Sequence, residues 1–128
     1  MRLRLLILAG LMSMAVVACG GAPTKIYLGT PVSGTLTSSD ANVEGWKSKP
    51  YVIDVREGIE YFVQLAGKNG NNIGIWSTEA DGYLVEIDSE VTARTSLYTF
   101  SETGPQDLFL RSPDSEVPSP FTFRVWTR

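Results

Sequence analysis

The chain has 128 residues, of which 43% are apolar and 20% are charged, a composition typical of a globular protein. Histidine is absent from the sequence, and the one cysteine is Cys19. The composition therefore excludes an internal disulfide and a Cys/His zinc site, and it removes Ser-His and Cys-His pairs from the possible catalytic machinery.

The first 18 residues have the pattern of a cleaved leader. Arg2 and Arg4 precede an apolar run of about 14 residues, which is too short to cross a bilayer. The run ends in Val16-Val17-Ala18-Cys19, which resembles the bacterial lipobox. The resemblance implies that residues 1–18 are removed and that Cys19 carries acyl chains as the mature N-terminus. Gly20 stands where aspartate retains lipoproteins at the inner membrane, so the same rule implies the outer membrane in a diderm cell.

The alternative is an ordinary secretory leader that leaves Cys19 as a free thiol, an unattractive state in an oxidising compartment. Two or three acyl chains, by contrast, anchor a protein almost permanently. Without residues 1–18 the chain has nine Lys and Arg against 14 Asp and Glu, a net charge of about −5 that disfavours nucleic acid as a partner. We therefore expect a lipid-anchored protein of the bacterial cell envelope that faces the periplasm or the exterior.

Residues 19–24 are expected to be the lipidated cysteine and a short tether, and residues 25–128 one domain. In this domain short β-branched and aromatic segments alternate with turn residues, and no helical period is sustained. The predicted strands are Lys25–Leu28, Val32–Thr37, Tyr51–Val55, Ile59–Leu65, Ile73–Ser77, Tyr83–Ile87, Thr95–Ser101, Leu108–Arg111 and Phe121–Thr127.

The strand pattern predicts an all-β fold, a single antiparallel β-sandwich of the jelly-roll kind with about eight or nine strands. Glu57-Gly58 gives the strongest hairpin signal, joining Tyr51–Val55 to Ile59–Leu65. Three prolines predict a loop over Ser112–Pro120, because proline has no N–H to donate. The expected core contains Tyr51, Ile53, Val55, Ile59, Tyr61, Val63, Leu65, Phe121, Phe123 and Val125.

The order of these segments resembles the bacterial pre-peptidase C-terminal (PPC) domain, a small β-sandwich appended to secreted peptidases. The similar segments are Gly34-Thr35-Leu36 for the opening strand, Tyr51–Leu65 for the central hairpin, Thr103-Gly104 with Leu108–Leu110 for a corner and strand, and Phe121–Val125 for the closing strand. The resemblance implies a non-catalytic module. Lys47-Ser48-Lys49-Pro50 stands where many members carry an acidic pair, so a calcium site is not implied there.

Two further segments match ligand-binding motifs only in part. Asp40–Gly45 has the first half of an EF-hand loop, but its twelfth position is Tyr51, so a polar loop between strands is the better interpretation. Gly67–Gly70 lacks the Walker spacing and predicts a turn. We therefore expect neither a metal site nor a cofactor.

Trp46, Trp76 and Trp126 are the candidates for a binding surface, since indole rings stack on sugars and anchor protein partners; packing inside the fold is the alternative. Trp126 alternates with Phe121 and Phe123 and should point outward. The Ser112–Pro120 loop is a further candidate. The favoured function is a non-catalytic binding or assembly module for an envelope protein or a glycan. Two alternatives stay open: a periplasmic inhibitor or accessory of a separate protease, and a hydrolase that uses carboxylates alone.

Overall fold

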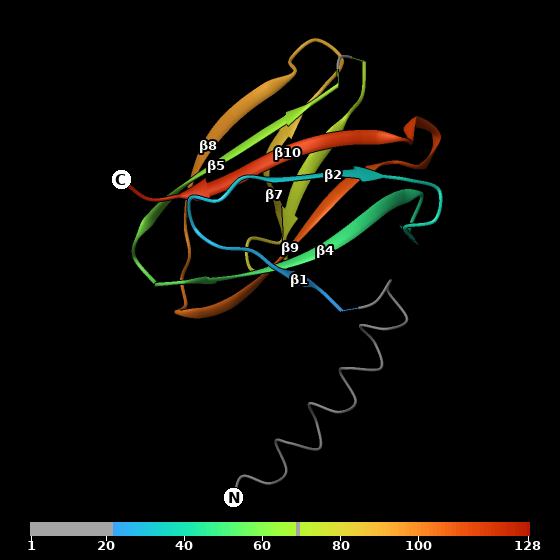
Figure 1. The fold of residues 1–128 in the computed structure, drawn as a ribbon. Coiled ribbons are helices and arrows are strands. Elements are labelled where there is room, and N and C mark those ends of the chain that lie inside the picture. The colour runs from blue at the N-terminus through green and yellow to red at the C-terminus, as the bar shows by residue number, and fades with distance from the viewer. Residues whose placement is uncertain (1–21, 69) are drawn as a thin grey trace, which may run out of the picture.

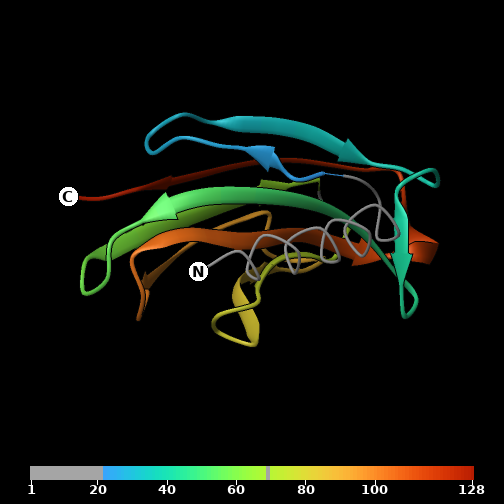
Figure 2. The ribbon, with the colours of Figure 1, turned by 90° about the horizontal axis from the view of Figure 1, so that it is seen from below.

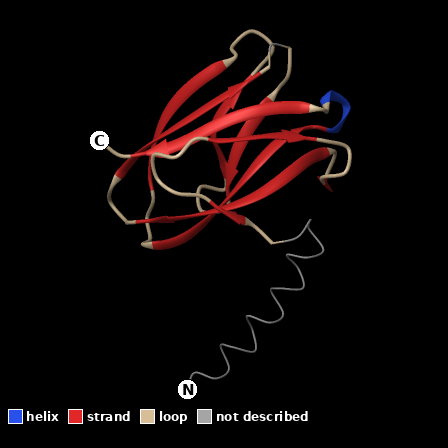
Figure 3. Cartoon of the chain, viewed as in Figure 1, coloured by secondary structure: helices blue, strands red, loops and turns tan. Residues whose placement is uncertain are grey.

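The computed structural model describes residues 22–68 and 70–128, which form two β-sheets (Figure 1). Residues 1–21, with the predicted leader and Cys19, lie outside the described residues. Sheet A contains, in spatial order, β1 (Thr24–Lys25), β4 (Trp46–Val55), β9 (Gly104–Pro113), β6 (Ile73–Ser77) and β7 (Gly82–Ile87), and β3 (Ala41–Val43) pairs with β4. Sheet B contains β2 (Val32–Leu36), β10 (Ser119–Trp126), β5 (Glu60–Gly67) and β8 (Ala93–Thr99). A 3-10 turn, η1 (Asp114–Glu116), lies between β9 and β10 (Figure 3).

The two sheets pack face to face, with β2 and β10 above β4 and β9 in Figure 2. The predicted all-β sandwich is confirmed, with ten strands in the described part of the chain. Its pairings are antiparallel except for the short parallel pairing of β1 with β4. The strand that the sequence analysis missed is β3, which forms a hairpin with β4 through Glu44 and Gly45, both at positive φ. The polar segment Asp40–Gly45 is therefore mostly hairpin.

The core lies between the sheets and is made by alternate residues of their strands. Tyr51 of β4 meets Phe123 of β10 edge to face, with ring centroids 5.1 Å apart. Nine of the ten predicted core residues are buried: Tyr51, Ile53, Val55, Tyr61, Val63, Leu65, Phe121, Phe123 and Val125. The prediction is wrong for Ile59, because its side chain is 41% exposed. It lies in the turn before β5, where the alternation of the strand has not yet begun.

The predicted hairpin between β4 and β5 is also wrong. β4 pairs with β9 in sheet A, whereas β5 pairs with β10 and β8 in sheet B. The chain crosses from one sheet to the other around Gly58, at φ +77°. The crossing is held by the N–H of Glu57, which donates to Thr103 Oγ1 at 2.9 Å, and by the N–H of Gly58, which donates to the Phe100 carbonyl at 3.1 Å. The sequence could not show this crossing, because apolar residues alternate in the same way in two strands that are neighbours in one sheet and in two strands that lie in facing sheets.

The loop between β9 and β10 is shorter than Ser112–Pro120, because β9 continues to Pro113 and β10 begins at Ser119. Pro113 pairs with β4 only, and Pro120 pairs with β2 only. Each proline therefore lies where one ladder has already ended, which is where a sheet tolerates a residue without an N–H. Here the prolines mark strand ends rather than a long loop.

The N-terminal end of the domain also differs from its prediction. Thr24, expected in the tether, pairs with Tyr51 as the first residue of β1. The strand predicted over Lys25–Leu28 ends at Lys25, although the N–H of Ile26 still donates to the Val52 carbonyl at 2.9 Å. The chain then turns away from sheet A toward sheet B.

Glu79, in the turn between β6 and β7, links the two sheets. Its carboxylate accepts hydrogen bonds from the Tyr98 hydroxyl of β8 at 2.8 Å and from the N–H of Ser101 at 3.2 Å, and it also accepts the Ser101 hydroxyl. The hydrogen bond from the Ser101 side chain, followed by that from Tyr98, lowers the pKa of Glu79 below its usual value.

Two isoleucines test the core assignment. Ile53→Ala should lower the free energy of unfolding by about 2–5 kcal/mol, because it leaves a cavity between the sheets. Ile59→Ala should lower it by less than about 1 kcal/mol, because the side chain is already 41% exposed and its removal leaves no closed cavity. Urea unfolding of both variants measures the difference. Equal losses would contradict the placement of Ile59 in an exposed turn.

A second prediction concerns pH. Because the pKa of Glu79 is lowered in the folded state, its contribution to stability is present above the unfolded pKa and is lost as pH falls through the folded pKa. Glu79→Gln should therefore lower the free energy of unfolding by about 1 kcal/mol at neutral pH, and less in acid. Urea unfolding across the acid range measures this, with Glu57→Gln, an exposed glutamate, as control. A loss that does not depend on pH would contradict the assignment.

Candidate functional site

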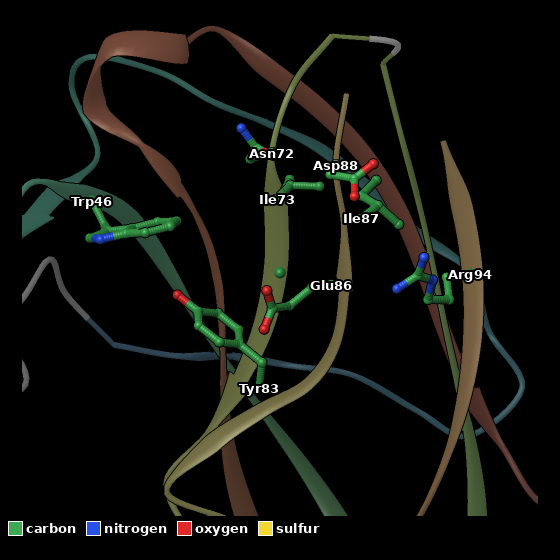
Figure 4. A pocket seen from close by; sticks show the side chains of 9 residues that line it. Trp46, Asn72, Ile73, Tyr83, Glu86, Ile87, Asp88 and Arg94 are labelled. Carbon is green, nitrogen blue, oxygen red and sulfur yellow. The ribbon is translucent and has the colours of Figure 1, made fainter. Parts of the chain in front are cut away.

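A shallow cleft of about 220 Å³ lies along β6 and β7 of sheet A. Figure 4 shows Trp46 of β4 at one end, Arg94 of β8 at the other, and Tyr83 and Glu86 between them. The residues that line the cleft are Trp46, Asn72, Ile73, Gly74, Tyr83, Glu86, Ile87, Asp88 and Arg94. Four strands or strand ends from both sheets therefore contribute to one concave surface.

Two aromatic rings form one side of the cleft. The Trp46 and Tyr83 rings have centroids 6.2 Å apart and are tilted by 46°. Tyr83 lies down on the sheet because Gly74 has no side chain: a Cβ there would be 2.7 and 2.8 Å from two carbons of the tyrosine ring. Burial raises the pKa of the Tyr83 phenol, and the charge of Arg111 partly opposes this shift. Both rings keep part of their surface in solvent.

Polar groups form the other side of the cleft. Asp88 Oδ1 accepts the N–H groups of Glu90 at 2.9 Å and Val91 at 3.0 Å, and these two bonds lower the pKa of Asp88. By contrast, Glu86 and Arg94 make no side-chain hydrogen bond or ion pair within residues 22–68 and 70–128. The Glu86 carboxylate and the Arg94 guanidinium are thus available for hydrogen bonds to a ligand, although the charge of Arg94 also contributes to lowering the pKa of Asp88.

Residues at the end of β9 and in the β9–β10 connection form hydrogen bonds with Asn72, which lines the cleft. Glu116 accepts the backbone N–H of Asn72 at 2.6 Å and its side-chain amide at 2.9 Å. The buried hydroxyl of Ser112 donates to the Asn72 carbonyl at 2.7 Å. The candidate segment Ser112–Pro120 therefore packs against the connection that leads into β6, and it orients Asn72 at the rim of the cleft.

Trp76 lies beside the cleft on the outer face of sheet A. It is paired with Tyr83 on β7 and with Phe109 on β9. The Arg111 guanidinium lies 4.5 Å from the centre of the Trp76 ring, close enough for a cation–π contact. Trp46 and Trp76 thus belong to the same face of the molecule, although 30 residues separate them in the sequence.

Trp126 lies on the opposite side of the molecule, on the outer face of sheet B, where its alternation with buried Phe123 and Val125 places it. Its ring stacks on Phe62, with centroids 5.2 Å apart, and the Arg124 guanidinium lies 4.0 Å from its centre. Phe62 is paired with Leu97, which is 50% exposed. Leu97, Phe62 and Trp126 form a row across β8, β5 and β10, which we call the sheet B row.

Sequence reasoning missed Gly74, Tyr83, Glu86 and Arg94. The available signal was Gly74 itself, because a glycine inside a strand often marks a close approach of another group. The partial EF-hand motif does not gather ligands: Asp40 forms an ion pair with Lys49 at 2.9 Å. In the part of the chain that the structure describes, no group of three Asp, Glu, His or Cys side chains is placed to hold a metal ion.

Neither a known family model nor a curated protein matches the sequence. Solved structures do match the fold. The PPC domain of a Bacillus anthracis collagenase matches with a TM-score of 0.56 and 12% identity, over 81% of this chain and 94% of that one. The fold is thus similar to that of the PPC domain, as the sequence pattern suggested. Within the described residues, no helix has the length and apolar character needed to cross a membrane.

Two other structures share this fold. A periplasmic inhibitor of g-type lysozyme from Aeromonas hydrophila matches with a TM-score of 0.52 and 12% identity, over 84% of this chain and 100% of that one. A surface-associated copper-binding protein, CorA, of Methylomicrobium album matches with a TM-score of 0.51 and 10% identity, over 84% and 99%. At these identities the comparisons show a shared architecture.

Proposed function

We propose that the chain is a lipid-anchored, non-catalytic glycan-binding protein of the bacterial cell envelope. The observation that carries the proposal is the cleft, where the Trp46 and Tyr83 rings lie at one end, Glu86 lies beside Tyr83, and Arg94 lies at the other end (Figure 4). Two of the proteins with this fold are described as periplasmic and surface-associated, which supports a location outside the cytoplasm.

The mixture of charges in the cleft favours a neutral, hydroxyl-rich ligand. An anion would be repelled by Glu86 and Asp88, and a cationic peptide would meet the guanidinium of Arg94 beside these carboxylates, so neither sign of charge is matched along the whole cleft. A sugar hydroxyl both donates and accepts, so it can bind the carboxylate and the guanidinium at once. The apolar face of a sugar ring can lie against Trp46 or Tyr83, in the way that aromatic rings commonly contact partly apolar ligands.

The side chains of the two cleft carboxylates, Glu86 and Asp88, are both exposed to solvent. A glycosidase needs one carboxylic acid that stays protonated, which enzymes achieve by placing it in an apolar pocket. Asp88 is not that acid, because the N–H groups of Glu90 and Val91 lower its pKa. The open setting of both carboxylates favours binding without chemistry over the carboxylate-based hydrolase.

The anchor is part of the proposal. Residues 1–18 are the leader, Cys19 carries the lipid, residues 20–23 are a short tether, and residues 24–128 are the binding domain, which begins with β1. The support is the lipobox-like Val16-Val17-Ala18-Cys19. Since Gly20 is not aspartate, the outer membrane is the destination in a diderm cell.

A protein partner is the second candidate, and the sheet B row favours it. Two arginines flank the aromatic rings of this row. The Arg124 guanidinium lies over the Trp126 ring, and the Arg128 guanidinium lies over the Phe62 ring. Tryptophan and arginine are enriched where protein interfaces have their strongest contacts. An inhibitor or accessory of a separate protease would use this surface.

Substitutions of single aromatic residues distinguish glycan binding in the cleft from protein binding at the sheet B row. Trp46→Ala and Tyr83→Ala should each weaken co-sedimentation with purified peptidoglycan sacculi about tenfold, which corresponds to about 1.4 kcal/mol. Trp126→Ala is the matched control, because it removes an indole from the other sheet and should leave this binding unchanged. If Trp126→Ala is the variant that loses binding, the cleft is not the site. Release of soluble sugar by the wild-type protein, abolished by Glu86→Gln, would favour the hydrolase.

Fractionation of cells tests the anchor. The wild-type protein should remain with the membranes after a high-salt wash, because acyl chains rather than charges hold it there. Cys19→Ala should prevent acylation and shift the mature domain to the soluble fraction or leave an uncleaved precursor. An unchanged size and unchanged membrane association would contradict the lipid anchor.

A further inference from the structure

Tyr27 and Leu28 are the two most unusual surface residues of the β1–β2 connection. Their side chains are 62% and 45% exposed, and they follow each other directly in the chain. They lie beside Lys25, Ile53 and Asp54 around a small hollow. Two adjacent large apolar side chains in water are a feature that a binding partner commonly covers.

The connection holds these side chains in a defined turn. The N–H of Thr30 donates to the Tyr27 carbonyl at 3.2 Å, and the N–H of Gly29 donates to the Val125 carbonyl of β10 at 2.7 Å. Before the turn, the N–H of Ile26 is bound to Val52 of β4, and the Ile26 side chain is buried. The segment is therefore fixed to both sheets while Tyr27 and Leu28 point away from them.

The length of the tether limits what this surface can face. If Cys19 carries the lipid, as proposed above, three residues lead from it to Ala22, a span of at most about 11 Å. Ala22 lies next to Thr24, Lys49 and Tyr51 at the β1 edge of sheet A. This edge is thus held close to the bilayer, and the chain runs from it directly to Tyr27.

The charge of the edge fits a bilayer surface. The processed chain has a net charge of about −5, but beside Tyr27 the Asp54 carboxylate is paired with Lys25 at 2.7 Å. The Lys25 ammonium also lies 5.7 Å from the centre of the Tyr27 ring. Tyrosine is enriched at the boundary between water and hydrocarbon, and lysine reaches from there to the headgroups.

We propose that Tyr27 and Leu28 are a membrane-contact segment that enters the headgroup region of the bilayer to which Cys19 is anchored, and that they orient the domain. The inference rests on the proposed lipid anchor. Because β1 and β7 lie at opposite edges of sheet A, this orientation turns Glu86 and Asp88 away from the membrane. The cleft then faces the envelope material beyond the lipid surface.

Two single-cysteine variants of the lipidated, full-length protein test the orientation. Acylation blocks the sulfur of Cys19, so Leu28→Cys and Leu97→Cys each provide one reactive thiol for an environment-sensitive fluorophore. Leu97 is the matched control, a similarly exposed leucine on β8, at the edge of sheet B opposite β2. The labelled proteins are reconstituted into phosphatidylethanolamine–phosphatidylglycerol vesicles, with and without nitroxide-labelled lipid.

The probe at position 28 should be quenched by nitroxide lipid at least threefold more than the probe at position 97, and the order should reverse with aqueous iodide. Tyr27→Cys repeats the measurement at a second site, and circular dichroism verifies that each variant is folded. Equal quenching at positions 28 and 97, in protein that floats with the vesicles, overturns the membrane contact but leaves the anchor. Failure of the acylated protein to float overturns the anchor and the contact together.

Discussion

The contact between the inward side chains of β4 and β10 is the constraint on which the rest of the structure depends. Tyr51 meets Phe123 edge to face and also approaches Phe121, so an aromatic cluster joins sheet A to sheet B. Because side chains alternate along a strand, filling the interior with these rings sends their neighbours outward. The same alternation places Trp76 on the outer face of sheet A and Trp126 on the outer face of sheet B.

The two edges of sheet A have different roles in this arrangement. At one edge, β1 follows the proposed anchor in the chain and leads to the exposed turn at Tyr27. At the other edge, β7 carries Glu86 and Asp88, with Tyr83 lying over Gly74 of the neighbouring β6. In our proposals the sheet thus separates the edge that lies near the membrane from the edge that binds the ligand. Loops and rims on a rigid sandwich are a common location for binding sites.

The alternation of apolar residues led both to the correct core predictions and to the two errors, the burial of Ile59 and the hairpin between β4 and β5. It placed Ile53, Val63 and Phe123 in the core, because a period of two puts one face of each strand inside. It also placed Ile59 there, although this residue lies in a turn and is exposed. The hairpin was wrong for a related reason: burial of one face does not say whether the next strand lies beside it or across from it. Hydrogen bonds from Glu57 and Gly58 to Thr103 and Phe100, far away in the sequence, decide the crossing.

The sequence by itself determined the class of fold, most of the core and the outward direction of Trp126, because these depend on local alternation. It also showed which catalytic pairs the chain lacks, since that needs only a count of histidines and cysteines. The tertiary structure decided which strands are neighbours and which distant residues share a surface. Trp46, Tyr83, Glu86 and Arg94 come from three strands of two sheets, and no short-range pattern relates them. Their proximity arises from strand order, which is set by long-range hydrogen bonds and packing rather than by the spacing of residues along the chain.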